Sequence, residues 1–333
     1  MSELSVFTPG KLYIAGEYSV VARATRAWLM PTSRGITARV QDSHTFRIIS
    51  DGFDIAYDVS LNALSAQPLI KETLRTAHAL IENKNIRVRP TTIVLTSTLT
   101  HNRRSLGLGS SGAVVAGILR ALTRFHAIDM DAVTLFKAAV YVQRNALGRS
   151  SFGDVAQAVS PTPILYRPFD AFTAPLAFDD IFRYWEGLSI DPFEYPLVPL
   201  SVVNTGEKTS SQVLVSRVES CAHTDAYAAF LTTAASTFDE LVESQIHRNI
   251  KRFLQTISTL NTAFKTLQDA LDIPLFTEGM GRIARWVDPS VSAMKFSGAG
   301  GGDNVLIFHY DTHVQRAFEA TLDKHAPTPL LIL

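Results

Sequence analysis

The sequence has one cysteine, no excess of charge of either sign, and no apolar run of the roughly 18 residues needed to cross a bilayer. The single Cys221 excludes an internal disulfide and a zinc site built from several cysteines. Since 31 Lys and Arg balance 31 Asp and Glu, the chain is not typical of proteins that bind nucleic acid or an anionic membrane. The first residues, "MSELSVFTPGK", lack the basic start and apolar core of a signal peptide, so we expect a cytoplasmic protein.

The length indicates more than one domain. A chain of 333 residues exceeds the usual size of a single hydrophobic core, so we predict two domains. Residues 161–199 are rich in proline and aromatic side chains and are the candidate crossing between them. We place the boundary between residues 190 and 191.

Hydrophobic periodicity predicts strands and helices mixed in both halves, an α+β protein without internal repeats. Short apolar runs separated by turns predict strands over residues 12–57, and a β-branched run predicts a strand over 91–99. The remaining predicted elements are helices over 69–85, 113–126, 131–147 and within 222–270, and strands over 201–206 and after the glycines of 294–310.

A glycine-rich stretch, "GLGSSG", precedes the helix predicted over 113–126. Glycines at 107, 109 and 112 permit positive φ, and N–H groups at a helix start attract an anion. A dinucleotide-binding fold uses the same spacing with an acidic residue about 20 positions later; Asp129 is near that distance but follows a predicted helix. A Walker loop would have lysine after its last glycine, where this chain has Ala113, and the other protein kinase motifs are missing. Ser110 and Ser111 favour a nucleoside triphosphate, because a hydroxyl there can ligate Mg²⁺ or cap the helix.

Two further loops contain residues that could bind a substrate or take part in catalysis. In "GRSSFGD" (148–154), Asp154 could accept a proton from a substrate or orient it; alternatively, it caps a helix over "VAQAV". In "SGAGGGD" (297–303), four glycines exceed what a tight turn needs and favour a backbone nest around an anion.

Three motifs in this order, "PGKLYIAGEY" (9–18), "GLGSSGAVV" (107–115) and "SGAGGGD", resemble the GHMP kinase superfamily, which includes galactokinase, homoserine kinase and mevalonate kinase. Within it, "GKLYIAGEY", "SSFGD" and "TGEKTSSQVLV" (205–215) resemble the bacterial phosphomevalonate kinases. The resemblance covers most of the chain. It implies a two-domain fold, with a ribosomal protein S5 domain 2-like, ATP-binding N-terminal domain (1–190) and an α/β C-terminal domain (191–333).

The resemblance also implies an activity and its residues. An enzyme of this kind transfers the ATP γ-phosphate to 5-phosphomevalonate with Mg²⁺ as the only other cofactor, and acts as a monomer or homodimer. Asp154 and Lys11 would be catalytic, and Ser111 would face the metal. ATP phosphates would lie on Gly107, Leu108, Gly109, Ser110, Ser111 and Gly112. The implied substrate contacts are Lys11, Tyr18, Arg104, Ser150, Ser151, Ser210, Ser211, Gly298, Ala299 and Gly300.

The chain departs from the family pattern at two of these places. Gln143 stands where many relatives have a metal-binding glutamate, eleven residues before Asp154. Ser105 stands where phosphomevalonate kinases often have lysine, and we expect Arg104, beside Arg103, to supply that charge. The alternatives to a phosphomevalonate kinase are a mevalonate kinase, another GHMP kinase and a catalytically silent regulator. The basic groups at the acceptor end favour phosphomevalonate, and the presence of Lys11 and Asp154 disfavours a silent protein.

Overall fold

The computed structural model describes residues 3–22, 25–101, 104–148, 150–169, 175–207, 209–325 and 330–331. The chain forms two compact units. The first unit comprises Met1–Lys11, Pro31–Thr162 and Phe169–Ile190, and the second comprises Leu12–Met30, Pro163–Pro168 and Asp191–Leu333. The chain therefore passes repeatedly between the units, and the functional division at residue 190 stays a prediction.

The first unit contains most of a seven-stranded sheet with the strand order β4-β3-β5-β2-β8-β9, in which β1 also pairs with β2. In β2, Ile36, Ala38 and Val40 are buried and alternate with more exposed residues, as expected for a strand with one face on a core. The strands are β1 (Glu3–Ala15), β2 (Ala27–Asp42), β3 (Phe46–Ser50), β4 (Phe53–Tyr57) and β5 (Thr91–Ser97). The strand-rich opening is confirmed.

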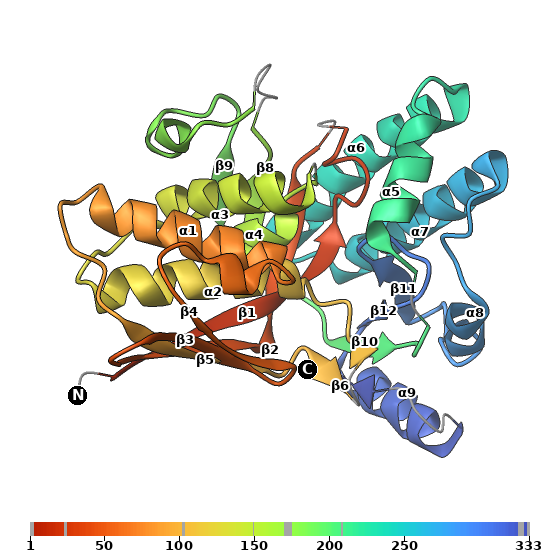
Figure 1. Cartoon of the computed structure of the whole chain (residues 1–333). Helices are drawn as coiled ribbons and strands as arrows, with labels where there is room; N and C mark the ends of the chain where they lie inside the picture. The colour runs from red at the N-terminus through yellow and green to blue at the C-terminus, as the bar shows by residue number, and fades with distance from the viewer. Residues whose placement is uncertain are drawn as a thin grey trace. The chain divides into compact units, whose positions relative to one another are not determined.

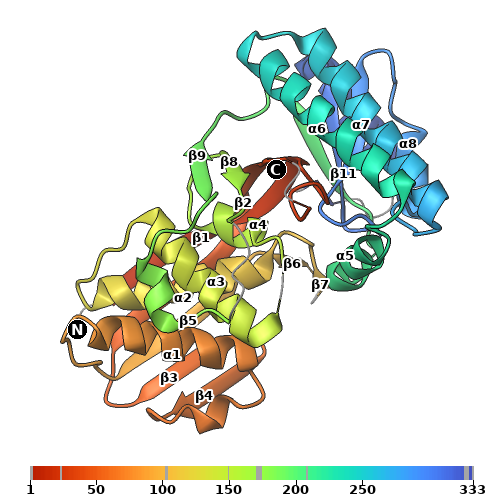
Figure 2. The same ribbon diagram turned by 90° about the horizontal axis from the view of Figure 1, so that it is seen from above.

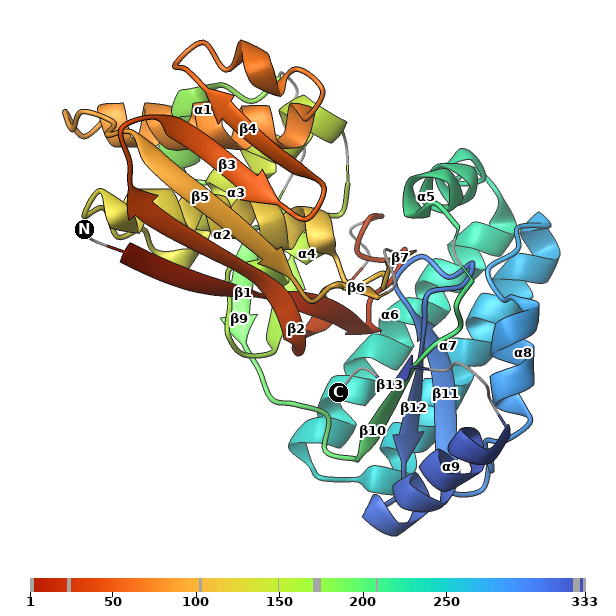
Figure 3. The same cartoon turned by 60° about the horizontal axis from the view of Figure 1, so that its bottom comes forward.

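Four helices lie together on one face of this sheet (Figures 1 and 3). They are α1 (Pro68–Glu82), α2 (Ser110–Phe125), α3 (Ala132–Leu147) and α4 (Gly153–Ala158). Eleven residues of α2 are buried, which confirms a largely internal helix after the glycine loop. Shorter elements are η1 (Asn62–Leu64), β6 (Thr100–His101), β7 (Arg104–Ser105), β8 (Ile164–Arg167), η2 (Phe178–Phe182) and β9 (Ser189–Pro192).

The second unit contains a sheet with the strand order β11-β12-β10-β13, antiparallel throughout. Helices α6 and α7 cover one face (Figures 2 and 3), and α9 covers the other (Figure 3). Ring centroids of Phe296 and Phe264 are 4.6 Å apart, and those of His309 and Phe318 are 5.2 Å apart on the α9 side. The elements are β10 (Leu200–Asn204), α5 (Ser211–Ser220), α6 (Asp225–Ile246), α7 (Ile250–Leu271), α8 (Glu278–Ala284), β11 (Ser292–Ser297), β12 (Asn304–His309), α9 (Thr312–His325) and β13 (Leu330–Leu331).

Two details refine the prediction. The helical periodicity over 222–270 corresponds to two helices, because Asn249 accepts a hydrogen bond from the Arg252 N–H and begins α7 anew. The third glycine loop connects two antiparallel strands, β11 and β12. Among the described residues, no helix combines the length and apolar character needed to cross a membrane.

Candidate functional site

The first glycine loop places two backbone N–H donors at the start of α2. Gly107 and Gly109 have φ of +69° and +76°, and Gly109 is the N-cap of the helix. The N–H groups of Ser110 and Ser111 form no hydrogen bond within the described part of the chain. The α2 dipole adds positive potential at the same point, so this loop can hold an anion.

Lys11 and Asp154 both contact this loop. The Lys11 N–H donates to the carbonyl of Leu108 (2.8 Å), and its Nζ donates to the carbonyl of Gly107 (3.3 Å). A Cβ on Gly109 would lie 2.9 Å from Cγ of Lys11 and 3.0 Å from Cβ of Asp154. Gly109 therefore allows the lysine and the carboxylate to approach the loop at one point.

The carboxylate of Asp154 is held by two neutral donors. Its Oδ2 accepts from the N–H of Gly112 at 2.9 Å and from Nε2 of Gln143 at 3.0 Å. A Cβ on Gly112 would lie 2.7 Å from the Asp154 carbonyl carbon, so only glycine fits there. Phe152 is the N-cap of α4, and the alternative that Asp154 caps this helix is therefore wrong.

Gln143 is nearly buried, with 3% of its surface exposed. From the sequence, Gln143 stood out only because a metal-binding glutamate was expected at its position. In the structure, its side-chain amide donates directly to Asp154. The spacing of Gln143 and Asp154 in the sequence does not predict this contact, because the contact depends on the packing of α3 against α4. Among the described residues, no group of three or more His, Cys, Asp or Glu could hold a metal ion.

The serines of the second loop shape the turn before α4. Oγ of Ser150 accepts from the N–H of Phe152 (3.1 Å), and Oγ of Ser151 accepts from the N–H of Gly153 (3.4 Å). Arg104 lies exposed in β7, immediately before the first glycine loop. Arg103, its neighbour in the sequence, and Arg149, in the second loop, lie outside the described residues.

The third loop, in the second unit, has left-handed backbone almost throughout. Gly298, Gly300, Gly301 and Gly302 have φ of +94°, +74°, +69° and +119°. The Gly301 N–H donates to the Leu275 carbonyl (2.7 Å) and the Asp303 N–H to the Glu207 carbonyl (2.8 Å). The N–H groups of Ala299 and Gly300 bond to no described residue, and they are the candidate anion donors.

Tyr18 is joined to this loop. Its hydroxyl donates to the carbonyl of Ala299 at 2.5 Å, and its backbone φ is +59°. Burial raises the pKa of Tyr18, so the phenol remains a neutral donor. Its predicted role as a substrate contact would have to use the hydroxyl lone pairs that remain.

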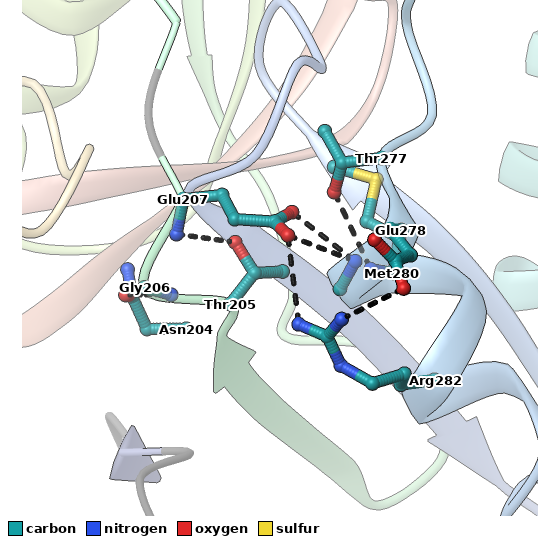
Figure 4. A network of polar contacts seen from close by, with 9 residues as sticks. Asn204, Thr205, Gly206, Glu207, Thr277, Glu278, Met280 and Arg282 are labelled. Atoms are coloured by element: carbon teal, nitrogen blue, oxygen red, sulfur yellow. Dashed lines mark hydrogen bonds and ion pairs between the residues drawn. The ribbon is translucent and has the colours of Figure 1, made fainter.

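Glu207 fastens the segment that leads to Ser210 and Ser211. Figure 4 shows its carboxylate accepting from the N–H of Gly279 (3.0 and 3.2 Å) and facing NH2 of Arg282 (3.5 Å). The backbone carbonyl of Glu207 accepts from the N–H of Asp303, and Oγ1 of Thr209 donates to the Gly301 carbonyl (2.7 Å).

Ser210 is the N-cap of α5 and Ser211 is its first residue, and both are exposed. The segment that leads to Ser210 and Ser211 is thus tied to the third glycine loop.

The predicted site residues form two groups. In the first unit, Lys11, Gly107–Gly112 and Asp154 converge on one loop, with Gln143 behind them. In the second unit, Tyr18 and Gly298–Gly300 are in contact, and Glu207 and Thr209 connect them to Ser210 and Ser211.

Comparisons with known proteins identify a matching family and a relative of similar length. Residues 68–161 match the family described as GHMP kinases N terminal domain. The phosphomevalonate kinase of Streptomyces sp. (strain CL190) is 26% identical over 324 residues, which cover 89% of this chain and 87% of that protein.

Two solved structures share the fold over nearly their whole length. The Lin0012 protein from Listeria innocua has a TM-score of 0.90 at 23% identity, covering 100% of this chain and 98% of that one. Streptococcus pneumoniae phosphomevalonate kinase, in complex with phosphomevalonate and AMPPNP, has a TM-score of 0.83 at 23% identity, covering 99% and 98%. The α+β two-domain GHMP fold expected from the sequence is confirmed, and the chain is similar to GHMP kinases over nearly its whole length.

Proposed function

We propose that this protein is a phosphomevalonate kinase, which transfers the γ-phosphate of ATP to the phosphate of 5-phosphomevalonate. The observation that carries the proposal is the convergence of Lys11 and Asp154 on Gly109, beside the α2 N–H groups that bond to no described residue. This is a phosphoryl-transfer arrangement, with donors for phosphate, a cation and a carboxylate. The similarity to the Streptomyces enzyme selects phosphomevalonate as the acceptor.

The first glycine loop would bind the triphosphate. Donors at the N-terminus of a 16-residue helix offset the charge of phosphate, and the positive φ of Gly107 and Gly109 brings the backbone close to it. Leu108, Ser110 and Ser111 complete the loop. AMPPNP bound to the pneumococcal enzyme supports ATP as the phosphate donor.

The residues present fit a Mg²⁺ ion carried mainly by the nucleotide. Mg²⁺ commonly retains several waters and takes only one or two protein oxygens, and the hydroxyl of Ser111 is such an oxygen at the start of α2. Gln143 contributes no carboxylate. When bound, the ion would neutralise charge on the β- and γ-phosphates.

Asp154 would orient the acceptor rather than act as a strong base. A phosphate monoester is already largely ionised near pH 7, so little proton abstraction is needed. Two donors hold Oδ2, and Oδ1 forms no hydrogen bond with a described residue. Lys11 would offset the crowding of negative charge as donor and acceptor phosphates approach.

Each of the two groups contains candidate contacts for an acceptor, and they are proposed separately for each unit. Ala299 and Gly300 would donate their N–H groups to the acceptor's anionic ends, with Gly298 and Tyr18 shaping that turn. Ser210 and Ser211 offer hydroxyls at the start of α5, and Arg104, Ser150 and Ser151 would contact the acceptor in the first unit.

The experiment is ADP release from purified protein with Mg-ATP, offering phosphomevalonate and mevalonate in parallel, with ATP alone as the blank. We expect turnover with phosphomevalonate only. Turnover with mevalonate only would move the protein to the mevalonate kinases, and no turnover despite tight ATP binding would favour another acceptor or a silent regulator.

A further inference from the structure

A lysine and a glutamate form a buried ion pair in the second unit. The side chain of Lys295, in β11, is 0% exposed and that of Glu17 is 1% exposed. Nζ of Lys295 donates to Oε1 of Glu17, to the carbonyl of Phe296 (2.6 Å) and to that of Tyr13 (3.4 Å). The ammonium is therefore fully hydrogen-bonded.

This pair is a poor means of stabilising the fold. Removing two charges from water costs several kcal/mol per ion, and apolar residues of similar volume often serve as well. Burial raises the pKa of Glu17 and lowers that of Lys295, while their mutual attraction opposes both changes. Oε2 of Glu17 is buried without a hydrogen-bond partner among the described residues, which adds a further cost.

The pair lies where two chain segments meet the third glycine loop. Glu17 belongs to the turn that follows β1, in which Gly16 and Tyr18 both have positive φ. Lys295 lies two residues before Ser297, where the loop begins. Lys295 lowers the pKa of Glu17 most, and the backbone of Gly298, at the start of the loop, lowers it further.

Neighbouring contacts fasten the same stretch. Oγ of Ser297 accepts from the Tyr13 N–H at 2.7 Å, and the Ala299 carbonyl accepts from the Tyr18 hydroxyl. Ser297 is thus tied to the end of β1, and Ala299 to the turn that follows it. The N–H groups of Ala299 and Gly300 follow immediately and are left without partners in the described chain.

We propose that Glu17 and Lys295 are positioning residues, which hold the backbone of Gly298–Gly300 in the conformation that receives the anionic group of the acceptor. Neither side chain touches the substrate. The inference rests on the proposed function, because it names the device that preorganises one of its binding loops.

The test replaces the whole pair. A single substitution would leave one buried charge unpaired and destabilise the fold. The double variant Glu17→Leu/Lys295→Met removes both charges at similar volume, so we expect a folded protein. We expect the KM for phosphomevalonate to rise about tenfold while the KM for ATP stays within about twofold, as for loss of acceptor positioning alone.

A second readout needs no substrate. In amide hydrogen exchange, we expect a protected Gly298 N–H in the wild type and faster exchange of Gly298 in the double variant. Ser292→Ala is the matched control: it removes a buried hydrogen bond to His309 (3.0 Å) from the same strand, away from the loop. We expect wild-type kinetics and unchanged Gly298 exchange in this control.

A folded double variant with wild-type KM values and exchange would overturn the proposal and leave the pair a purely structural one. If the double variant does not fold, amide hydrogen exchange of the wild-type protein tests the proposal instead. A Gly298 amide that exchanges as fast as the amides of Ala299 and Gly300 would also overturn the proposal. Absence of wild-type turnover with phosphomevalonate would instead reject the proposed function, while the exchange experiment would still report on the loop.

Discussion

The side-chain amide of Gln143 donates to Oδ2 of Asp154 across 3.0 Å, and the same oxygen accepts from the backbone of Gly112. Gln143 comes from α3, Asp154 from α4 and Gly112 from α2. The carboxylate is therefore fixed by two helices besides its own. At the position where the resemblance to GHMP kinases leads one to expect a metal-binding glutamate, this chain has a side-chain donor to Asp154.

Gln143→Met removes that donor at similar size. We expect kcat to fall by about tenfold with the KM for ATP nearly unchanged, because the carboxylate loses its orientation but the nucleotide loop is intact. Asn145→Ala, on the same helix, removes an exposed amide–carboxylate hydrogen bond to Glu72 (3.4 Å) and serves as control. Equal kinetics in the two variants would show that Gln143 does not orient Asp154.

Asp154→Asn keeps the shape of the side chain and removes its charge. We expect kcat to fall by about 100-fold or more, and KM to rise much less, because the charge acts on the acceptor during transfer. Steady-state kinetics with both substrates varied measure this. A variant with nearly wild-type kcat would remove Asp154 from the catalytic residues.

Glu207 stabilises the second unit by joining α8 to the third glycine loop, as Figure 4 shows in part. We expect Glu207→Ala to lower the free energy of unfolding by about 2 kcal/mol, because it removes charge-assisted hydrogen bonds to the Gly279 N–H. Glu278→Ala is the control, since Glu278 also faces Arg282 (3.5 Å) but is 88% exposed. Urea denaturation should show a change within about 0.5 kcal/mol for this control. Equal losses in both variants would contradict the role of Glu207.

His78 makes stability depend on pH. Burial against Phe46 and Tyr57 lowers the pKa of His78 to about 4, whereas the unfolded value is 6.5. The unfolded state therefore binds the proton first, so the contribution of His78 is full above pH 6.5 and is lost as pH falls toward 4. We expect the loss of unfolding free energy between pH 7.5 and 4.5 to be about 2 kcal/mol smaller in His78→Phe. Equal losses in variant and wild type would exclude a buried neutral His78.

Local features of the sequence predicted much of the fold and the loops. Apolar periodicity identified α1, α2 and α3, because each buries a continuous stripe or most of its surface. The glycines of the first and third loops pointed to these loops as binding sites, because the backbone there has positive φ at several positions. Those signals are local and do not depend on tertiary contacts.

Contacts between distant segments could not be predicted. Lysine is normally exposed, and only the tertiary structure shows that Lys295 is enclosed beside Glu17, 278 positions away. Similarly, Leu12–Met30 belongs to the second unit although it includes the end of β1 and the start of β2, whose other residues belong to the first. A weak signal did exist at Lys295, since a charge stands among the otherwise apolar or small residues of β11.

The most direct test of the account is phosphorus NMR of the product formed from Mg-ATP and phosphomevalonate. We expect the phosphate monoester signal to be replaced by two coupled diphosphate resonances, with one ADP formed for each diphosphate. ADP accompanied only by inorganic phosphate, or an unchanged monoester signal, would contradict the assignment of this protein as a phosphomevalonate kinase.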